Sequence, residues 1–121
     1  MIQRSGHAIE VRLCAEDDEF RPHAGTVLRF VPPASVRFDH AIFEGMTVSP
    51  HYDSMLGKLV AHAPTRGQAI DQLLSALAGM QLLGLPTNRA LLAACLDHPQ
   101  LRSGQALIPF LAEQGAAIRA E

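Results

Sequence analysis

The spacing of apolar residues changes at Pro64, and this change limits the folds that the chain can adopt. Before Pro64, apolar and polar residues alternate in short runs, which is the period of a strand with one buried face. After it, Ile70, Leu73, Leu74 and Leu77 recur at the spacing of one face of a helix. Strands followed by helices predict an α+β domain, in which an antiparallel β-sheet is flanked by about three helices.

The predicted strands are short and end at glycine- and proline-containing turns. They are expected at residues 8–14, 26–31, 36–38, 46–48, 56–61 and 80–83. In the strand at 26–31, the alternation places Leu28 and Phe30 on the face opposite Val27. Because the links between most strands are hairpin-sized, the sheet is expected to be antiparallel.

Helices are expected in the second half of the chain. The first begins after the N-cap residue Thr65 and ends at Gly79, a plausible left-handed position just past the helix. The second covers residues 88–96. A short third helix begins near Pro109, and the alanine-rich tail after Gln114 is expected to fray.

Length and charge exclude several classes of function. A chain of 121 residues fits a single domain, 1–121, which is small for a complete enzyme. The formal charge of -2 gives no overall attraction for nucleic acid or for an anionic membrane. The two cysteines, Cys14 and Cys95, show no metal-site spacing and are expected to be reduced thiols. Without a signal-peptide pattern or an apolar run of about 18 residues, the chain is expected in the cytoplasm.

The common catalytic motifs are missing from the sequence. The six histidines include no pair at HxH or HExxH spacing, so no metal ligand is predicted. A triad can be drawn from Ser54, His51 and Asp53, but neighbours in sequence cannot generally point at one another. No glycine-rich loop of the GxxxxGK or GxGxxG kind occurs. The chain is therefore not predicted to bind a nucleotide unaided.

The segment at residues 36–62 holds the remaining candidates for chemistry. Arg37 lies between two apolar residues, and its guanidinium could hold a carboxylate or bicarbonate through two hydrogen bonds. A surface arginine on an edge strand is the competing interpretation. Lys58 and Asp53 could form an ion pair or clamp the turn, and Tyr52 could pack with its hydroxyl on a backbone carbonyl.

Several motifs, taken together in order and spacing, resemble one family. They are GHAIEVRLCAED, F-x-P-x-x-G, VRFDHAIFEG, YDSMLGKL and LLGLPTN, and they cover residues 6–111. The chain resembles the C-terminal domain of biotin carboxylase, which occurs in biotin-dependent acyl-CoA carboxylases. This resemblance implies an antiparallel sheet flanked by helices, in agreement with the spacing of apolar residues.

The resemblance also implies an activity and a set of partners. The full enzyme uses ATP, Mg²⁺ and bicarbonate to carboxylate biotin, and its ATP-grasp domain would precede residue 1. The chain is then expected to be inactive alone, with no cofactor bound to it. Its implied partners are the ATP-grasp domain of the same subunit, a biotin carboxyl carrier domain and a carboxyltransferase subunit.

One site residue of the family maps onto this chain by resemblance. The arginine of the family's VR motif falls on Arg37, which is predicted as the catalytic and cofactor-binding residue, in contact with bicarbonate and the ureido oxygen of biotin. The residues before it, Pro33-Ala34-Ser35, depart from the family's glycine-rich turn. The alternative is a structural and dimerisation module without a catalytic contribution, because family members often dimerise partly through this domain.

Overall fold

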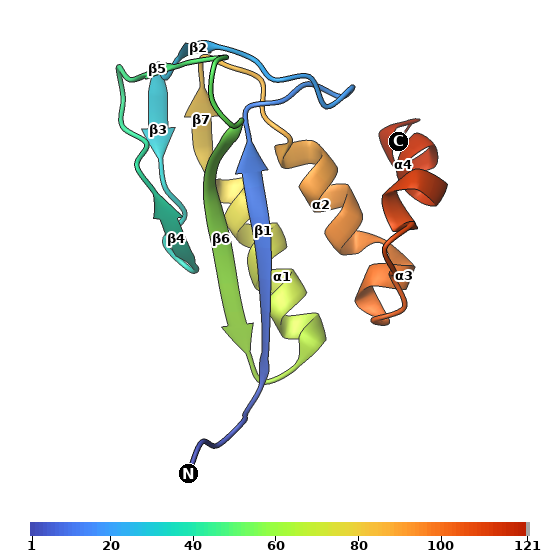
Figure 1. Ribbon diagram of the computed structural model, residues 1–121. Helices are drawn as coiled ribbons and strands as arrows, with labels where there is room; N and C mark the ends of the chain where they lie inside the picture. The colour runs from blue at the N-terminus through green and yellow to red at the C-terminus, as the bar shows by residue number, and fades with distance from the viewer. Residues whose placement is uncertain (121) are drawn as a thin grey trace.

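In the computed structural model, which describes residues 1–120, strands from the first half of the chain pack against helices from the second half (Figure 1). The central antiparallel sheet has the order β1-β6-β4, formed by His7–Cys14, Met55–Ala63 and Arg37–His40. Two further antiparallel pairs are β2 (Gly25–Thr26) with β5 (Thr47–Val48), and β3 (Arg29–Val31) with β7 (Gln81–Leu83). The helices are α1 (Arg66–Gly79), α2 (Arg89–Asp97), α3 (Pro99–Arg102) and α4 (Phe110–Ala120). The predicted α+β class is confirmed.

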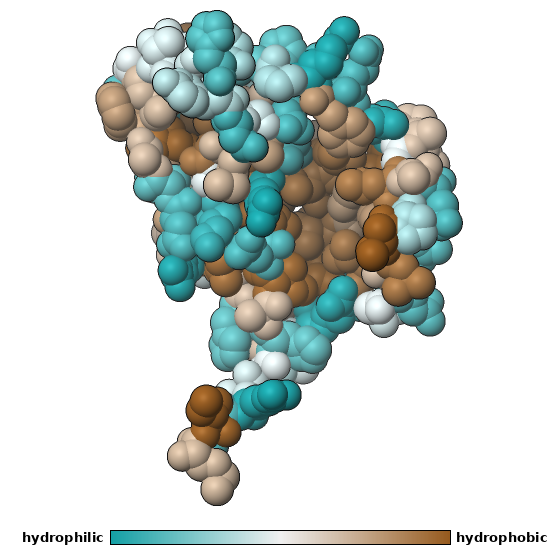
Figure 2. Space-filling view, viewed as in Figure 1, coloured by the Kyte–Doolittle hydropathy of each residue, from teal (hydrophilic) through white to brown (hydrophobic). Residues whose placement is uncertain are grey.

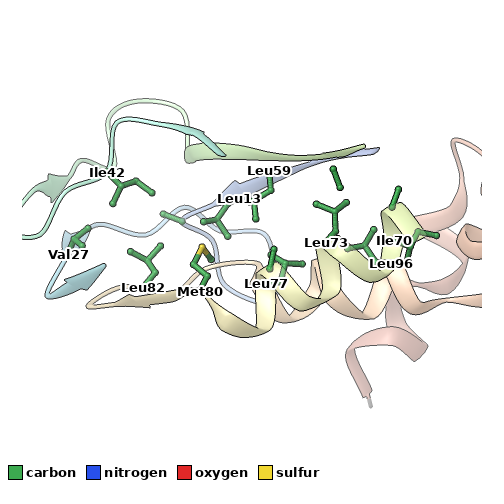
Figure 3. Packing of buried hydrophobic residues seen from close by; sticks show 14 of the residues in the cluster. Leu13, Val27, Ile42, Leu59, Ile70, Leu73, Leu77, Met80, Leu82 and Leu96 are labelled. Carbon is green, nitrogen blue, oxygen red and sulfur yellow. The ribbon is translucent and has the colours of Figure 1, made fainter. Parts of the chain in front are cut away.

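The core lies between the central sheet and α1. The two-residue period of β1 and β6 turns Leu13 and Leu59 inward, where neither has any exposed surface. Figure 3 shows these side chains pointing toward Leu73 and Leu77, which α1 presents from the opposite layer. Each fully buried leucine contributes about 1.5–3 kcal/mol from removal of apolar surface from water. This packing fixes which face of the sheet is left for polar residues.

The N-terminus of α1 is capped as the sequence predicted. Thr65 has an extended backbone, and its Oγ1 accepts a hydrogen bond from the Gln68 backbone N–H at 3.3 Å. Since this bond satisfies one of the free N–H groups of the first turn, Thr65→Ala is expected to lower the free energy of unfolding by about 1 kcal/mol. Urea denaturation followed by circular dichroism measures this loss. Thr65→Ser, which keeps the hydroxyl, should retain most of the stability.

The strand predicted at residues 26–31 is interrupted, and this part of the prediction was wrong. The Val27 N–H donates to the Met46 carbonyl, whereas the Leu28 N–H donates to the Leu83 carbonyl. The chain thus changes partner strands between these two residues, and the regular alternation is lost. Val27 is 1% exposed and Leu28 is 71% exposed, so Val27 is the one of these two neighbours that joins the core.

The helix ends also differ from the predictions. Gly79 is the last residue of α1, its φ lies outside the left-handed region, and the extended residue that follows is Met80. The tail expected to fray after Gln114 is helical through Ala120. It is held because Ile118 is buried and the Arg119 guanidinium stacks 5.1 Å from the centre of the Phe20 ring.

Cys14 and Cys95 are both free, as predicted, and each is half-buried. Within residues 1–120, no helix combines the length and the apolar character needed to cross a membrane.

Candidate functional site

The charged residues of three strands gather on the exposed face of the central sheet. In the sheet register, Lys58 of β6 lies opposite Arg12 of β1 on one side and opposite Asp39 of β4 on the other. Arg37 and Glu10 each lie two residues from one of these partners, and therefore on the same face. We call this surface the outer face, defined by Glu10, Arg12, Arg37, Asp39 and Lys58. The opposite face of β1 and β6 is covered by α1.

Arg37 lies on the outer face, as the sequence predicted, but its guanidinium already has a partner. Its Nε donates to Asp39 Oδ1 and its Nη2 donates to Asp39 Oδ2, both at 2.9 Å. These hydrogen bonds hold the pKa of Asp39 below its usual value and raise the pKa of Arg37, so both groups stay charged at neutral pH. This carboxylate takes two of the five N–H donors of the guanidinium, those on its Nε side, and within residues 1–120 Nη1 donates no hydrogen bond.

Arg12 is a second arginine on the same face, and the sequence reasoning did not single it out. Its side chain is 74% exposed, and its Nε lies 3.8 Å from Glu10 Oε1, too far for a hydrogen bond. Within residues 1–120 its guanidinium donates no hydrogen bond. Two features could have identified it: the alternation in residues 8–14 places it opposite the core, and it lies inside the motif GHAIEVRLCAED.

Lys58 lies between the carboxylates of the neighbouring strands. Its Nζ is 3.7 Å from Glu10 Oε2 and 4.0 Å from Asp39 Oδ2. The ion pair considered between Lys58 and Asp53 is therefore replaced by these two contacts. Exposed pairs of this kind contribute at most about 1 kcal/mol each, so their main effect is to hold both carboxylates in place between the arginines.

The other candidates for chemistry in the segment at 36–62 are Tyr52, Asp53 and Ser54, and they do not belong to the outer face. Asp53 Oδ1 accepts a hydrogen bond from the Met55 N–H at 2.8 Å, which is the turn clamp considered for it. Tyr52 is exposed, and within residues 1–120 its hydroxyl bonds to no backbone carbonyl. The Ser54 hydroxyl donates to Glu16, so the triad that can be drawn with His51 and Asp53 does not form.

Gly57 allows β4 to lie close to β6. It is paired with His40, and a Cβ at Gly57 would lie 2.8 Å from both the Asp39 carbonyl oxygen and a carbon of the Phe38 ring. We expect Gly57→Ala to push β4 away and to lower the free energy of unfolding by about 1–3 kcal/mol, the usual cost of overpacking. It should also shift the NMR signal of the Arg37 Nε–H, because the pair with Asp39 lies on the displaced strand.

Gly79→Ala provides the control, since a Cβ there meets no atom within 4 Å. It is expected to leave the Arg37 signal unchanged and to cause no loss of stability. An unchanged Arg37 signal in Gly57→Ala would contradict the role given to Gly57.

Comparison with solved structures gives the class of protein. The biotin carboxylase domain of 2-oxoglutarate carboxylase from Hydrogenobacter thermophilus was solved as a dimer in complex with MgADP, ADP and bicarbonate. It matches with a TM-score of 0.91 and 32% sequence identity, over 97% of this chain and 27% of that one. The chain therefore has the α+β fold of one part of a biotin carboxylase domain.

Sequence comparisons narrow the class to one family. The family model described as the biotin carboxylase C-terminal domain matches residues 10–113. Biotin carboxylase from Halalkalibacterium halodurans is 42% identical over 91% of this chain and 25% of its own length. The propionyl-CoA carboxylase alpha chain of Ruegeria pomeroyi is 34% identical over 93% of this chain and 20% of its own length. The chain therefore belongs to the biotin carboxylase C-terminal domain family, as its motifs predicted, and it spans a quarter or less of these two relatives.

Proposed function

We propose that this chain is the C-terminal domain of a biotin carboxylase subunit and supplies arginine side chains of the outer face to the ATP- and bicarbonate-dependent carboxylation of biotin. The observation that carries the proposal is the presence of two exposed arginines on one sheet face, on either side of Lys58. Guanidinium groups match the planar shape and charge of bicarbonate. The related domain from Hydrogenobacter thermophilus was solved with bicarbonate, which supports this choice of anion.

The two arginines differ in how easily they can bind an anion. Arg37 is the residue that the motif resemblance implies, but Asp39 already occupies two of its five N–H donors and neutralises its charge, which weakens its attraction for an incoming anion. Arg12 donates no hydrogen bond within residues 1–120, so an anion there displaces water and competes only with the loose contact to Glu10. We therefore propose that Arg12 makes the stronger contact with the anion and that Arg37 assists it, with Asp39 leaving its guanidinium when substrate binds.

The proposed contribution of these residues is electrostatic. When N1 of biotin loses its proton, negative charge moves onto the ureido oxygen. A fixed guanidinium that donates a hydrogen bond to this oxygen stabilises the charge as it develops. Arginine stays protonated at any working pH, so neither Arg12 nor Arg37 can serve as the base that removes the proton. The base, and the residues that hold ATP and Mg²⁺, are assigned to the ATP-grasp domain of the full subunit.

The test of the proposal uses the full-length subunit with free biotin, bicarbonate and MgATP. Variants at Arg12 and Arg37 should lose biotin-dependent ADP release while keeping a native circular dichroism spectrum. If both variants turn over at the normal rate, the proposed catalytic contribution is wrong. We further propose that the 121-residue chain alone has no carboxylase activity, and the same assay checks this.

A structural role is the second candidate for Arg37. Its strand, β4, is an edge strand of the central sheet, its side chain is 72% exposed, and its charge is already neutralised by Asp39. The Hydrogenobacter thermophilus relative was solved as a dimer. Analytical ultracentrifugation of the full-length subunit tests this role. If Arg37→Ala converts a dimer of subunits to monomers without changing turnover, Arg37 serves the contact between subunits.

A further inference from the structure

Two cations of the outer face lie directly opposite each other. In the register of β1 and β6, Arg12 is the cross-strand partner of Lys58. Like charges at such positions destabilise a sheet, so this pairing calls for a compensating charge nearby. Figure 2, viewed from the side of the outer face, shows hydrophilic side chains gathered over the strands of the central sheet, beside an apolar area that extends toward the C-terminal helices.

Glu10 is the carboxylate that these two cations share. Its Oε1 is 3.8 Å from Arg12 Nε, and its Oε2 is 3.7 Å from Lys58 Nζ. Both distances are too long for hydrogen bonds. The second carboxylate of the face, Asp39, is already bound by the Arg37 guanidinium. The five residues of the outer face thus comprise three cations and two carboxylates, and the excess positive charge lies around Arg12 and Lys58.

A pair with the same spacing on β4 is closed, whereas the pair on β1 is open. Arg37 and Asp39 are two residues apart on one face of a strand, and two hydrogen bonds of 2.9 Å join them. Glu10 and Arg12 have the same separation and the same two charges, yet they stay 3.8 Å apart. The open pair is the one whose carboxylate also faces the Lys58 ammonium at 3.7 Å.

We propose that Lys58 is a positioning residue that keeps the Arg12 guanidinium available for an anion. Lys58 attracts one oxygen of Glu10 and thereby prevents this carboxylate from closing onto Arg12. Without Lys58, Glu10 and Arg12 form the kind of bidentate pair that Arg37 makes with Asp39, and the Arg12 charge is neutralised in the same way. This inference rests on the proposed function, in which Arg12 contacts bicarbonate.

The NMR signal of the Arg12 Nε–H in the 121-residue chain tests the inference without an enzymatic assay. Lys58→Met keeps a long side chain but removes its charge, so Glu10 should close onto Arg12, shift this signal downfield and slow its exchange with water. Lys58→Arg keeps the charge and should leave the signal near its wild-type position. The double variant Lys58→Met/Glu10→Gln has the net charge of the wild type and should restore the signal. An unchanged Arg12 signal in Lys58→Met overturns the inference.

Steady-state kinetics of the full-length subunit give the second measurement. Lys58→Met should raise the KM for bicarbonate about two- to five-fold, the range that an exposed ion pair produces, and should leave kcat unchanged because saturating anion displaces Glu10 again. The double variant should return the KM to the wild-type value. If its KM stays high, Lys58 itself attracts the anion and the inference is wrong. A shifted Arg12 signal with an unchanged KM supports the effect of Lys58 on Glu10 and contradicts the anion contact proposed for Arg12.

Discussion

Arg12→Ala in the full-length subunit is expected to slow biotin carboxylation about 10²–10³-fold, the usual cost of removing one donor to a developing oxyanion. The reason is geometric: Arg12 is exposed on the outer face, and its one ionic contact within residues 1–120, to Glu10, is loose at 3.8 Å. Arg12→Lys keeps the charge but loses the planar fork, so it should recover only part of the rate. Biotin-dependent ADP release at saturating MgATP measures both variants.

The corresponding change at Arg37 separates its two candidate roles. If Arg37 assists by leaving Asp39, then Arg37→Ala lowers turnover, and Asp39→Asn lowers the KM for bicarbonate because the guanidinium is freed in advance. If Arg37 is structural, neither variant changes turnover. Full activity in Arg12→Ala together with a large loss in Arg37→Ala would reverse the order proposed for the two residues.

The composition of the outer face could be predicted from sequence to a large extent. A two-residue period is enough to place Arg12 opposite the core in β1 and Lys58 opposite the core in β6, and it also separates Arg37 from its apolar neighbours. That these strands lie side by side depends on their order in the sheet. The order β1-β6-β4 joins segments far apart in the chain, and no local pattern determines it.

Sequence patterns could not predict which side chains pair with one another. The bidentate contact between Arg37 and Asp39 depends on rotamers, and it changed which arginine is the more available donor. The break between β2 and β3 had a different cause, since Val27 and Leu28 follow partners from distant segments, at Met46 and Leu83. There tertiary contacts decided what local spacing left open.

Gly84→Ala is expected to be the most destabilising small substitution in the chain. Gly84 follows β7 with a φ of +116°, a conformation that residues with a side chain rarely adopt. An added Cβ would meet the Thr26 carbonyl oxygen at 1.9 Å, so β2 or the turn would have to move. Strain and steric overlap together should cost about 3 kcal/mol or more, a large share of the roughly 5–15 kcal/mol that stabilises a domain.

Gly67→Ala is the control for this variant. It tests whether the loss of stability in Gly84→Ala comes from the position of Gly84 and not from adding a methyl group to any glycine. Gly67 lies in α1, its φ is outside the left-handed region, and a Cβ there meets no atom within 4 Å. Alanine at a helical position of this kind should raise the free energy of unfolding by about 0.5–1 kcal/mol. Urea midpoints of the two variants should therefore move in opposite directions. If the midpoint of Gly84→Ala stays at the wild-type value, the close approach of this turn to β2 is wrong, and so is the placement of β7 beside β3.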